Sequence, residues 1–560
     1  MRAIYLLVCG FGTVFMSACG NSTVVEEEPA ATDTVSVEVL VEQLSSGDEA
    51  ARCLTIDALA EHGADAAPAV QALIGLMADE SALVRAHAAR TLGEIGDPAK
   101  PAAEVLAQAM ADDNEDVRLM AVGALAKIKP GKEKVVPLML KAMADEDYSV
   151  VLRATHALSS LGPDVVEPMI EALKNKKTAH WAVLVLHDLG PDAKPAVPAL
   201  LAILEDGDPE TQAAVVEALG DIGDPAAIPK LVEIANDHPY DIEIVAAFAL
   251  SKFGPAAKDA APHLEKGLES DDPAMQTVCA YSLAMIFPDD EEKKKQAVEL
   301  LVKAMTSDEE KVRVAAASAL LQLNPDPEIV KGPFLAAIAT SDEATRQGMF
   351  ASIASLGEEV VPRLQRALKE KPVRPYAARA LGEIGPKAAD AVPDLVASLE
   401  GESPEVREQI LMAIGHIGEN LDQAMPAAKA ALADEDPHVK RGGIYVLGRI
   451  GPGAKAASDD LYALLQSTGD NDDEDRLGTF AAWALVSIDP SKPEYAKAAV
   501  PHLKTALEDA RVGVRVEAAE ALGKLGALAK DAVGALEEAG KKVSDEEKAV
   551  YDEAISKIKG

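Results

Sequence analysis

The sequence predicts an all-α solenoid, in which short helix-turn-helix units stack along the chain. Two observations predict this fold class. One helical segment, Asp79–Pro98, has a recognisable beginning and end, and it recurs about every 33 residues along most of the chain. Aromatic residues make up only 3% of the 560 residues, so the core must consist mainly of small and aliphatic side chains that allow close helix packing.

The recurring segment predicts a single amphipathic helix. Val84, Ala88, Leu92 and Ile95 fall on one face of a helix with 3.6 residues per turn. Gly96 can take the left-handed conformation that ends a helix, and the proline two residues later cannot extend one. Gly96 therefore marks the end of the first helix in its repeat, and the equivalent residue of every repeat is called the reference position below.

The reference position occurs fifteen times, at intervals of 28 to 38 residues. Eleven of the fifteen residues are glycine, and a proline follows each of the other four directly. This regularity predicts about 15 helix-turn-helix repeats. The reference residues are Gly63, Gly96, Lys129, Gly162, Gly190, Gly223, Gly254, Phe287, Asn324, Gly357, Gly385, Gly418, Gly451, Asp489 and Gly526.

A second helix is predicted after each reference position. A proline stands at its beginning in many repeats, and proline is favoured in the first turn of a helix because its missing N–H would bond nothing there. Glycines also recur inside the first helices, where each costs up to about 1 kcal/mol relative to alanine. Close contact between neighbouring helices is the expected compensation. The prolines are Pro68, Pro198, Pro229, Pro262, Pro393 and Pro426, and the glycines are Gly93, Gly220, Gly382, Gly415, Gly448 and Gly523.

The repeat resembles the short HEAT-like repeats of the phycobilisome (PBS) lyase type. Residues 83–98, 312–325 and 373–386 carry the resemblance, which rests on Val-Arg, Ala-Ala and Ala-Leu-Gly-x-Ile-Gly-Asp-Pro before a proline-led second helix. It implies an α-α superhelix, a right-handed HEAT-like solenoid, with the second helices along its concave face. The expected solenoid covers 37–527, with a capping helix at 37–44, and capping helices follow at 528–560.

The sequence also repeats at a longer interval, which spans several of these short repeats. Residues 161–223 overlay 356–418 at an offset of 195 without a gap, and 26 of the 63 positions are identical. Both windows contain a 28-residue step between reference positions. We infer that a block of about six repeats was duplicated.

An arginine recurs eleven residues before the reference position, and an aspartate often precedes that arginine by six residues. The aspartate can accept hydrogen bonds from the next helix's first amides, and it can pair with an arginine of its own or the neighbouring repeat. Repeated pairing of this kind is expected to be architectural rather than ligand-binding. The expected structural ladder comprises Asp79, Arg85, Asp112, Arg118, Arg313, Arg346, Arg407, Asp509 and Arg515.

The first residues predict export. Arg2 precedes an apolar run of fourteen residues, which is too short to span a bilayer as a helix. Residues 1–18 are therefore expected to be a signal peptide. The sequence around Cys19 resembles a bacterial lipobox, which implies lipidation of Cys19, a membrane-anchored lipoprotein and a location facing the periplasm or the cell exterior; the alternative is plain secretion after Ala18. Residues 19–36 are polar and acidic and predict a flexible tether.

Charge narrows the range of partners. A formal net charge of −39 argues against nucleic acid, because phosphate binding needs clustered basic residues. It favours solubility and basic or cationic partners. One basic stripe interrupts the acidic sequence: Arg363, Arg366 and Lys369 recur every three residues on a predicted second helix. The stripe is expected to be solvated, with docking of an acidic partner as the alternative.

No catalytic, cofactor-binding or metal-binding constellation appears in the sequence. The acidic loop 470–475 invites a calcium interpretation, but Asp475 stands where a calcium loop of the EF-hand type needs glycine. Cys53 and Cys279 are expected to be core residues. The chain is therefore expected not to be an enzyme but a protein-interaction scaffold of the cell envelope. The alternatives are a lyase-type enzyme or enzyme subunit that handles a cofactor, and a structural envelope component.

Overall fold

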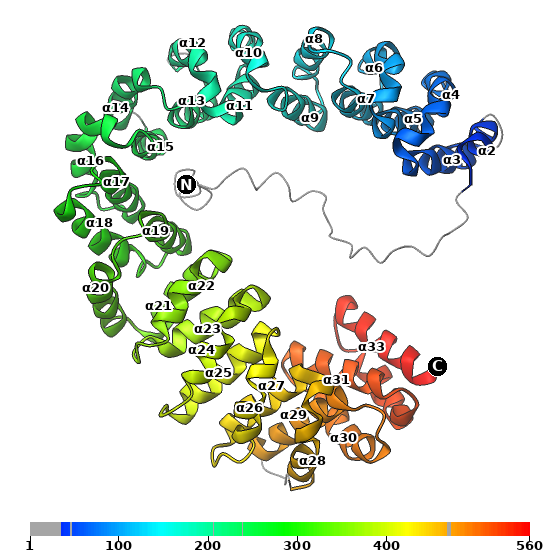
Figure 1. Ribbon diagram of the computed structural model, residues 1–560, viewed down its shortest axis with the longest axis vertical. Helices are drawn as coiled ribbons and strands as arrows, with labels where there is room; N and C mark the ends of the chain where they lie inside the picture. Colours follow the sequence, from blue (N-terminus) through cyan, green and yellow to red (C-terminus); the bar gives the residue numbers. More distant parts are fainter. Residues whose placement is uncertain (1–34, 45–47, 205–206, 238, 468–471) are drawn as a thin grey trace. The chain divides into compact units, whose positions relative to one another are not determined.

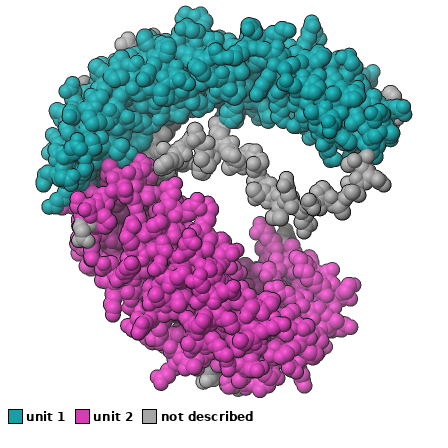
Figure 2. All heavy atoms as spheres, viewed as in Figure 1, with its two compact units in different colours: residues 1–297 teal, residues 298–560 magenta. Residues whose placement is uncertain are grey.

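The computed structural model describes residues 35–44, 48–204, 207–237, 239–467 and 472–560 (Figure 1). Within these ranges every regular element is an α-helix or a 3₁₀-helix, and none is a strand. The all-α prediction is confirmed. The chain divides into unit 1, residues 1–297, and unit 2, residues 298–560 (Figure 2).

The first helices number fifteen in the described chain, and each ends just before a predicted reference position. They are α3 Glu49–Glu61, α5 Ala82–Ile95, α7 Glu115–Ile128, α9 Tyr148–Ser159, α11 Ala179–Leu189, α13 Pro209–Ile222, α15 Tyr240–Ser251, α17 Pro273–Ile286, α19 Glu310–Leu323, α21 Glu343–Ala354, α23 Arg374–Ile384, α25 Pro404–Ile417, α27 Pro437–Ile450, α29 Asp472–Ile488 and α31 Val512–Leu525.

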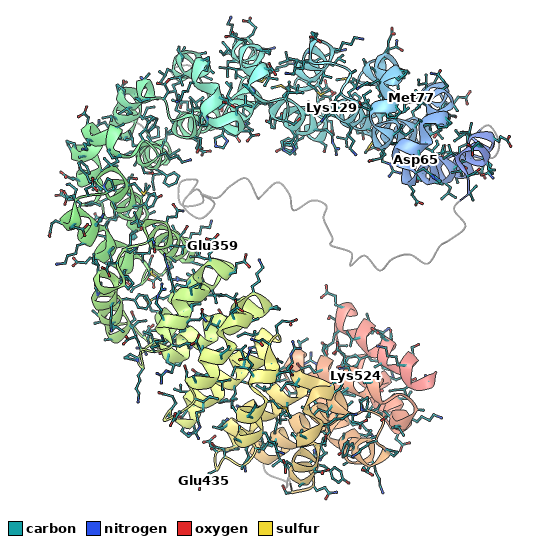
Figure 3. All side chains as sticks on the ribbon, viewed as in Figure 1. Asp65, Met77, Lys129, Glu359, Glu435 and Lys524 are labelled. Carbon is teal, nitrogen blue, oxygen red and sulfur yellow. The ribbon has the colours of Figure 1, made fainter. Side chains whose placement is uncertain are left out.

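The backbone at the reference positions explains why these helices end there. Thirteen of the fifteen residues have a positive φ, and they include Lys129 at 45° and Asn324 at 42°. A left-handed residue turns the chain out of the helix and allows the next element to begin at once. Figure 3 labels Lys129 at the end of α7.

In most repeats a 3₁₀-helix, which the sequence did not predict, precedes the second helix. Pro68 lies inside the 3₁₀-helix η1 Gly63–Ala69 and not in the α-helix that follows. The other five predicted prolines each occupy the first turn of a second helix. The second helices are α4 Val70–Leu76, α6 Ala103–Ala109, α8 Lys132–Ala142, α10 Val166–Ala172, α12 Val197–Ile203, α14 Ile228–Asp237, α16 Ala261–Gly267, α18 Glu291–Ala304, α20 Pro327–Thr340, α22 Val361–Ala367, α24 Val392–Ala397, α26 Met425–Ala431, α28 Ser458–Ser467, α30 Pro493–Ala506 and α32 Val533–Ala539.

The remaining 3₁₀-helices stand at the same point in their repeats. They are η2 Asp97–Ala102, η3 Gly162–Val165, η4 Gly190–Ala196, η5 Pro225–Ala227, η6 Gly254–Ala260, η7 Gly357–Val360, η8 Gly385–Ala391, η9 Leu421–Gln423, η10 Gly451–Ala457 and η11 Gly526–Ala532.

The two kinds of helix form two layers. Within unit 1, Figure 1 shows the first helices α5, α7, α9, α11, α13 and α15 on the inner side of the curve and the second helices on the outer side. The expectation that second helices line the concave face is therefore wrong for unit 1. Small residues of the first helices make the close contacts that curvature toward this layer requires: a Cβ on Gly93 of α5 would lie 2.9 Å from Cα of Ala124 on α7.

Single helices close both ends of the described solenoid. The helix α2, Val37–Gln43, buries Leu40 at the beginning. At the end, α33 Asp545–Lys559 packs on α31 in the place of a further first helix and buries Tyr551. Capping helices of this kind cover apolar surface that the terminal repeats would otherwise expose to water.

Several expectations concern residues outside this description. The signal peptide 1–18, Cys19 and nearly all of the tether 19–36 lie outside the described residues. Asp470 of the expected acidic loop also lies outside, whereas the backbone from Asp472 onward is already helical as the beginning of α29.

Candidate protein-binding surface

Exposed apolar side chains lie on the first helices of unit 1. Leu54 on α3 is 71% exposed, Leu83 on α5 is 50% exposed and Tyr148 on α9 is 64% exposed. Their exposure places them off the apolar stripe that packs against the second helices. On α5, for example, Leu83 lies on a different stripe of the helix, which continues through His87 and Arg90. We call the exposed side of α3, α5, α7, α9 and α11 the inner face of unit 1.

Aromatic contacts fix the position of Tyr148 on this face. Its ring meets that of Trp181 on α11 edge-on, with ring centroids 5.4 Å apart. The ring of His180 also meets that of Trp181 edge-on, with centroids 5.4 Å apart. Edge-to-face pairs are favoured by the ring quadrupoles, so Tyr148 is held as a rigid and exposed apolar group.

A hollow of about 350 Å³ lies between α5 and α7 on the same face. Leu83 and Met120 supply apolar walls, and Asp116 and Arg90 stand at the polar side. Arg90 and His87 both contact Asp57 of α3, at 2.6 Å and 2.5 Å. The hollow is therefore lined by both apolar and charged groups, and Asp57 holds two of the lining side chains, His87 and Arg90, in place.

Farther along unit 1 the inner face carries a network of charged residues centred on His187 of α11. Its Nε2 lies 2.8 Å from Oδ2 of Asp221 on α13, and its Nδ1 lies 3.6 Å from Oδ1 of Asp188. Burial opposes the imidazolium, but the hydrogen bonds to Asp188 and Asp221 prevail and raise the pKa of His187 to about 9. His187 is therefore positively charged at neutral pH and links α11 to α13.

The predicted Arg–Asp ladder runs between neighbouring repeats. The Nε and Nη2 of Arg85 each donate at 2.8 Å to one carboxylate oxygen of Asp112, in the next repeat. Nη1 of Arg85 donates to the carbonyl oxygen of Asp79, 2.9 Å away in the preceding turn. One guanidinium thus holds two consecutive turns together. The same pairing joins Arg52 to Asp79, Arg118 to Asp145 and Arg407 to Asp434, and Arg515 pairs with Glu547 of α33.

Three ladder residues differ from the expected arrangement. Arg313 donates to the carbonyl oxygens of Ser307 and Asp308, and Arg346 to those of Ile338 and Ser341. Their partner positions, 27 residues onward, are Thr340 and Val373, which carry no charge. Asp509 pairs with Arg511 two residues away, while its carbonyl oxygen accepts from Arg515.

The predicted basic stripe of α22 is split. Arg366 and Lys369 are exposed. Arg363 is instead half-buried, and its guanidinium donates to the carbonyl oxygens of Leu320 and Leu321 at the end of α19. Of the three stripe residues, Arg366 and Lys369 are therefore the two exposed on the surface for contact with an acidic protein.

No three histidine, cysteine or acidic side chains in the described ranges gather in a way that could hold a metal ion. None of the described helices has the length and apolar character needed to cross a bilayer. Cys53 and Cys279 are buried free thiols, and burial raises the pKa of Cys279 to about 12.

Helix pairs that stack through a shared apolar core, and that a repeated ion pair joins from turn to turn, define the class of α-helical repeat solenoids. The sequence model for HEAT repeats matches residues 37–114, 102–186, 166–251 and 392–485, which is more than half of the chain. The chain belongs to the HEAT-repeat family. The model of the PBS lyase HEAT-like repeat also matches residues 373–401 and 514–539, and the first range contains one of the three segments that carry the resemblance, 373–386.

The solved structures that match this chain share little sequence identity with it. Yeast importin-beta (Kap95p) is 14% identical, with a TM-score of 0.41 over 93% of this chain and 88% of that chain. The Kap95:Nup1 complex contains a chain that is 14% identical, with a TM-score of 0.46 over 95% and 84%. Kap121p bound to Nup53p is 10% identical, with a TM-score of 0.42 over 94% and 75%. A comparison with curated protein sequences gives no match.

Proposed function

We propose that this chain is a non-catalytic protein-interaction scaffold of the bacterial cell envelope that binds partners along the inner face of unit 1. The observation that carries the proposal is the exposure of Leu54, Leu83 and Tyr148 on one layer of helices. Isolated exposed apolar residues are ordinary, but large ones on one face, beside a hollow lined in part by charged groups, are typical of binding sites for other proteins.

The polar groups of the inner face support recognition rather than reaction. Asp57 pairs with both His87 and Arg90, and His187 pairs with Asp221. Groups held in this way can select a partner by charge and can fix its orientation, while apolar anchors supply most of the affinity.

Crosslinking in the native cell, followed by affinity capture of the chain, tests the binding face. We expect the variant Leu83→Ser to retain its crosslinked partner at least about tenfold less well, because losing an apolar anchor of an interface costs roughly 1.4 kcal/mol or more. Leu528→Ser is the matched control, since Leu528 is a 44% exposed leucine on η11, outside the inner face.

Three outcomes would count against the binding face. The same partner could be retained by Leu83→Ser and wild type alike, the two leucine variants could lose it equally, or no specific partner could be captured. Tyr148→Ser provides a second variant at an independent exposed position, so the conclusion does not rest on one side chain.

We also propose that the solenoid is tethered to a membrane through a lipid on Cys19, after removal of residues 1–18. The lipobox-like sequence around Cys19 supports this proposal. A single acyl chain binds membranes only weakly, so stable anchoring requires more than one acyl chain. Cells grown with labelled palmitate should incorporate label into wild type and into Cys53→Ala, but not into Cys19→Ala. Label that persists in Cys19→Ala, or that is absent from wild type, would contradict the anchor.

A further inference from the structure

An apolar pocket of about 200 Å³ lies in unit 2, where α19, α20, α21 and α22 meet. Twelve of its thirteen lining residues are apolar, and the thirteenth is Arg363. Phe334 of α20 and Phe350 of α21 form one wall, with their rings edge-on and centroids 5.7 Å apart. The pocket therefore has the composition of a small-molecule site, apolar throughout with one charged group.

The pocket exists because α20 covers its repeat incompletely. Unlike most second helices, α20 begins without a preceding 3₁₀-helix and carries Pro333 in its interior. Ile338 is the one buried side chain among the described residues of α20, while Val330 and Phe334 are only half-buried. A helix that buries so little of its apolar surface leaves that surface available to a ligand.

Arg363 closes the polar end of the pocket without an acidic partner. Its Nη1 donates to the carbonyl oxygen of Leu320 at 3.3 Å, and its Nη2 donates to the carbonyl oxygen of Leu321 at 3.1 Å and to Oδ1 of Asn324 at 3.0 Å. A guanidinium has five N–H donors, so two remain. No described carboxylate pairs with Arg363, although the chain has 93 acidic residues. Burial, together with the nearby charge of Arg366, lowers the pKa of Arg363.

The duplicated block shows that the polar end belongs to this copy alone. At the offset of 195, Arg363 corresponds to Pro168 and Asn324 corresponds to Lys129. Lys129 and Asn324 share the left-handed backbone, with φ of 45° and 42°. The turn geometry is therefore retained in both copies, whereas the arginine that faces the pocket occurs only in unit 2.

We propose that this pocket binds a small amphiphile whose apolar tail lies among Phe334, Phe350 and Leu364 and whose carboxylate pairs with the guanidinium of Arg363. An apolar cavity of about 150 Å³ holds a molecule of the size of benzene, so this pocket accepts a tail of about six to eight carbons. The carboxylate supplies the formal negative charge that Arg363 lacks, and a planar guanidinium fork is suited to such a group.

Binding of octanoate to the full chain, measured by isothermal titration calorimetry below the micelle concentration, tests the proposal. We expect saturable binding with one site, and at least about tenfold weaker binding of octanol, which has the tail without the charge. Propionate, which has the charge without the tail, should also bind at least about tenfold more weakly. These comparisons do not depend on a protein partner, so they are separate from the test of the scaffold.

Variants then locate the site. Arg363→Gln is expected to reduce octanoate affinity at least about tenfold and to bring it close to that of octanol, while Arg366→Gln, one turn farther along and exposed, should leave it unchanged. Ala367→Met, which fills the pocket, should abolish binding of both compounds. Circular dichroism verifies that each variant is folded, and Arg363→Lys provides a charged variant if Arg363→Gln does not fold.

Equal affinity for octanoate and octanol in the wild type would overturn the role of the carboxylate. Unchanged octanoate affinity in Arg363→Gln, or in Ala367→Met, would overturn the location. No measurable heat with octanoate at concentrations up to several millimolar would overturn the proposal as a whole.

Discussion

The variant Asp112→Asn is expected to destabilise the packing of α5 on α7 by about 2 kcal/mol. The substitution keeps the shape of the side chain but removes the charge that receives both N–H groups of Arg85 at 2.8 Å. The two side chains are only 18% and 15% exposed, so the guanidinium that remains is poorly solvated. Loss of one partner of such a pair costs more than the net contribution of the pair itself.

The same pair predicts a dependence on pH. The hydrogen bond from Arg85 holds the pKa of Asp112 below its ordinary value, although burial acts in the opposite direction. A lowered folded-state pKa means that the stabilisation is complete above the unfolded-state pKa of about 3.9 and is lost as the pH falls through the folded-state value. Asp112→Asn should therefore show a smaller loss of stability between about pH 5 and pH 2 than wild type.

Hydrogen exchange of the α5 and α7 amides is the appropriate measurement, because a solenoid unfolds repeat by repeat and not as one two-state unit. The neighbouring exposed residue supplies the control: Asp113→Asn removes the same charge from the same turn and should change exchange by less than about 0.5 kcal/mol. If both variants accelerate exchange equally, the effect comes from net charge and the ladder contributes nothing specific.

The ladder is interrupted in the part of unit 2 that contains the apolar pocket. Arg313 and Arg346 lie in consecutive repeats on either side of α20, and neither has a carboxylate in the next repeat. The ladder link to the next repeat is therefore missing at these two positions, although Lys331 pairs with Glu370 and Tyr376 donates to Glu343 across the repeats. The missing ladder pairs and the incomplete burial of apolar side chains thus coincide around α20. Such a segment opens at a lower free-energy cost than a fully paired repeat, so it can admit a ligand more easily.

The ends of the first helices could be predicted from the sequence because they depend on single residues. A glycine or a following proline determines where a helix stops, and thirteen of the fifteen reference residues adopt a positive φ. The division of second helices into a 3₁₀-helix and an α-helix could not be predicted. The 3₁₀-helices bury small side chains such as Ala66 and Ala69 of η1, and the sequence pattern alone does not identify these residues as a separate element.

The inner layer and the position of Arg363 could not be predicted either. Helical periodicity identifies the apolar face of each helix, but curvature arises from small rotations between repeats. Residues at i and i+3 differ by 60° in direction around a helix. That rotation is enough to turn Arg363 toward α19 while Arg366 faces solvent.

The expected compensation for glycines inside the first helices is confirmed. A Cβ placed on Gly220 or Gly382 would lie 3.0 to 3.2 Å from the facing alanine of the next first helix, and one on Gly523 would lie 3.1 to 3.2 Å from Ala554 of the capping helix α33. On Gly415 and Gly448 it would overlap the rings of Tyr445 and Trp483. These glycines allow neighbouring helices to approach closely. The packing gained by this close approach offsets the lower helix propensity of glycine.

Gly93→Ala is accordingly expected to destabilise unit 1 by about 1–3 kcal/mol, although alanine is the better helix former by about 1 kcal/mol. The added Cβ would lie 2.9 Å from Cα of Ala124, a backbone atom that cannot move without shifting the whole of α7. Gly75→Ala is the matched control, because Gly75 is helical in α4 and no atom lies within 4 Å of an added Cβ. That variant should stabilise the chain by about 0.5–1 kcal/mol. Thermal unfolding and hydrogen exchange of α5 and α7 measure both changes, and an increase in stability for Gly93→Ala would show that the helices are not held at the distance described here.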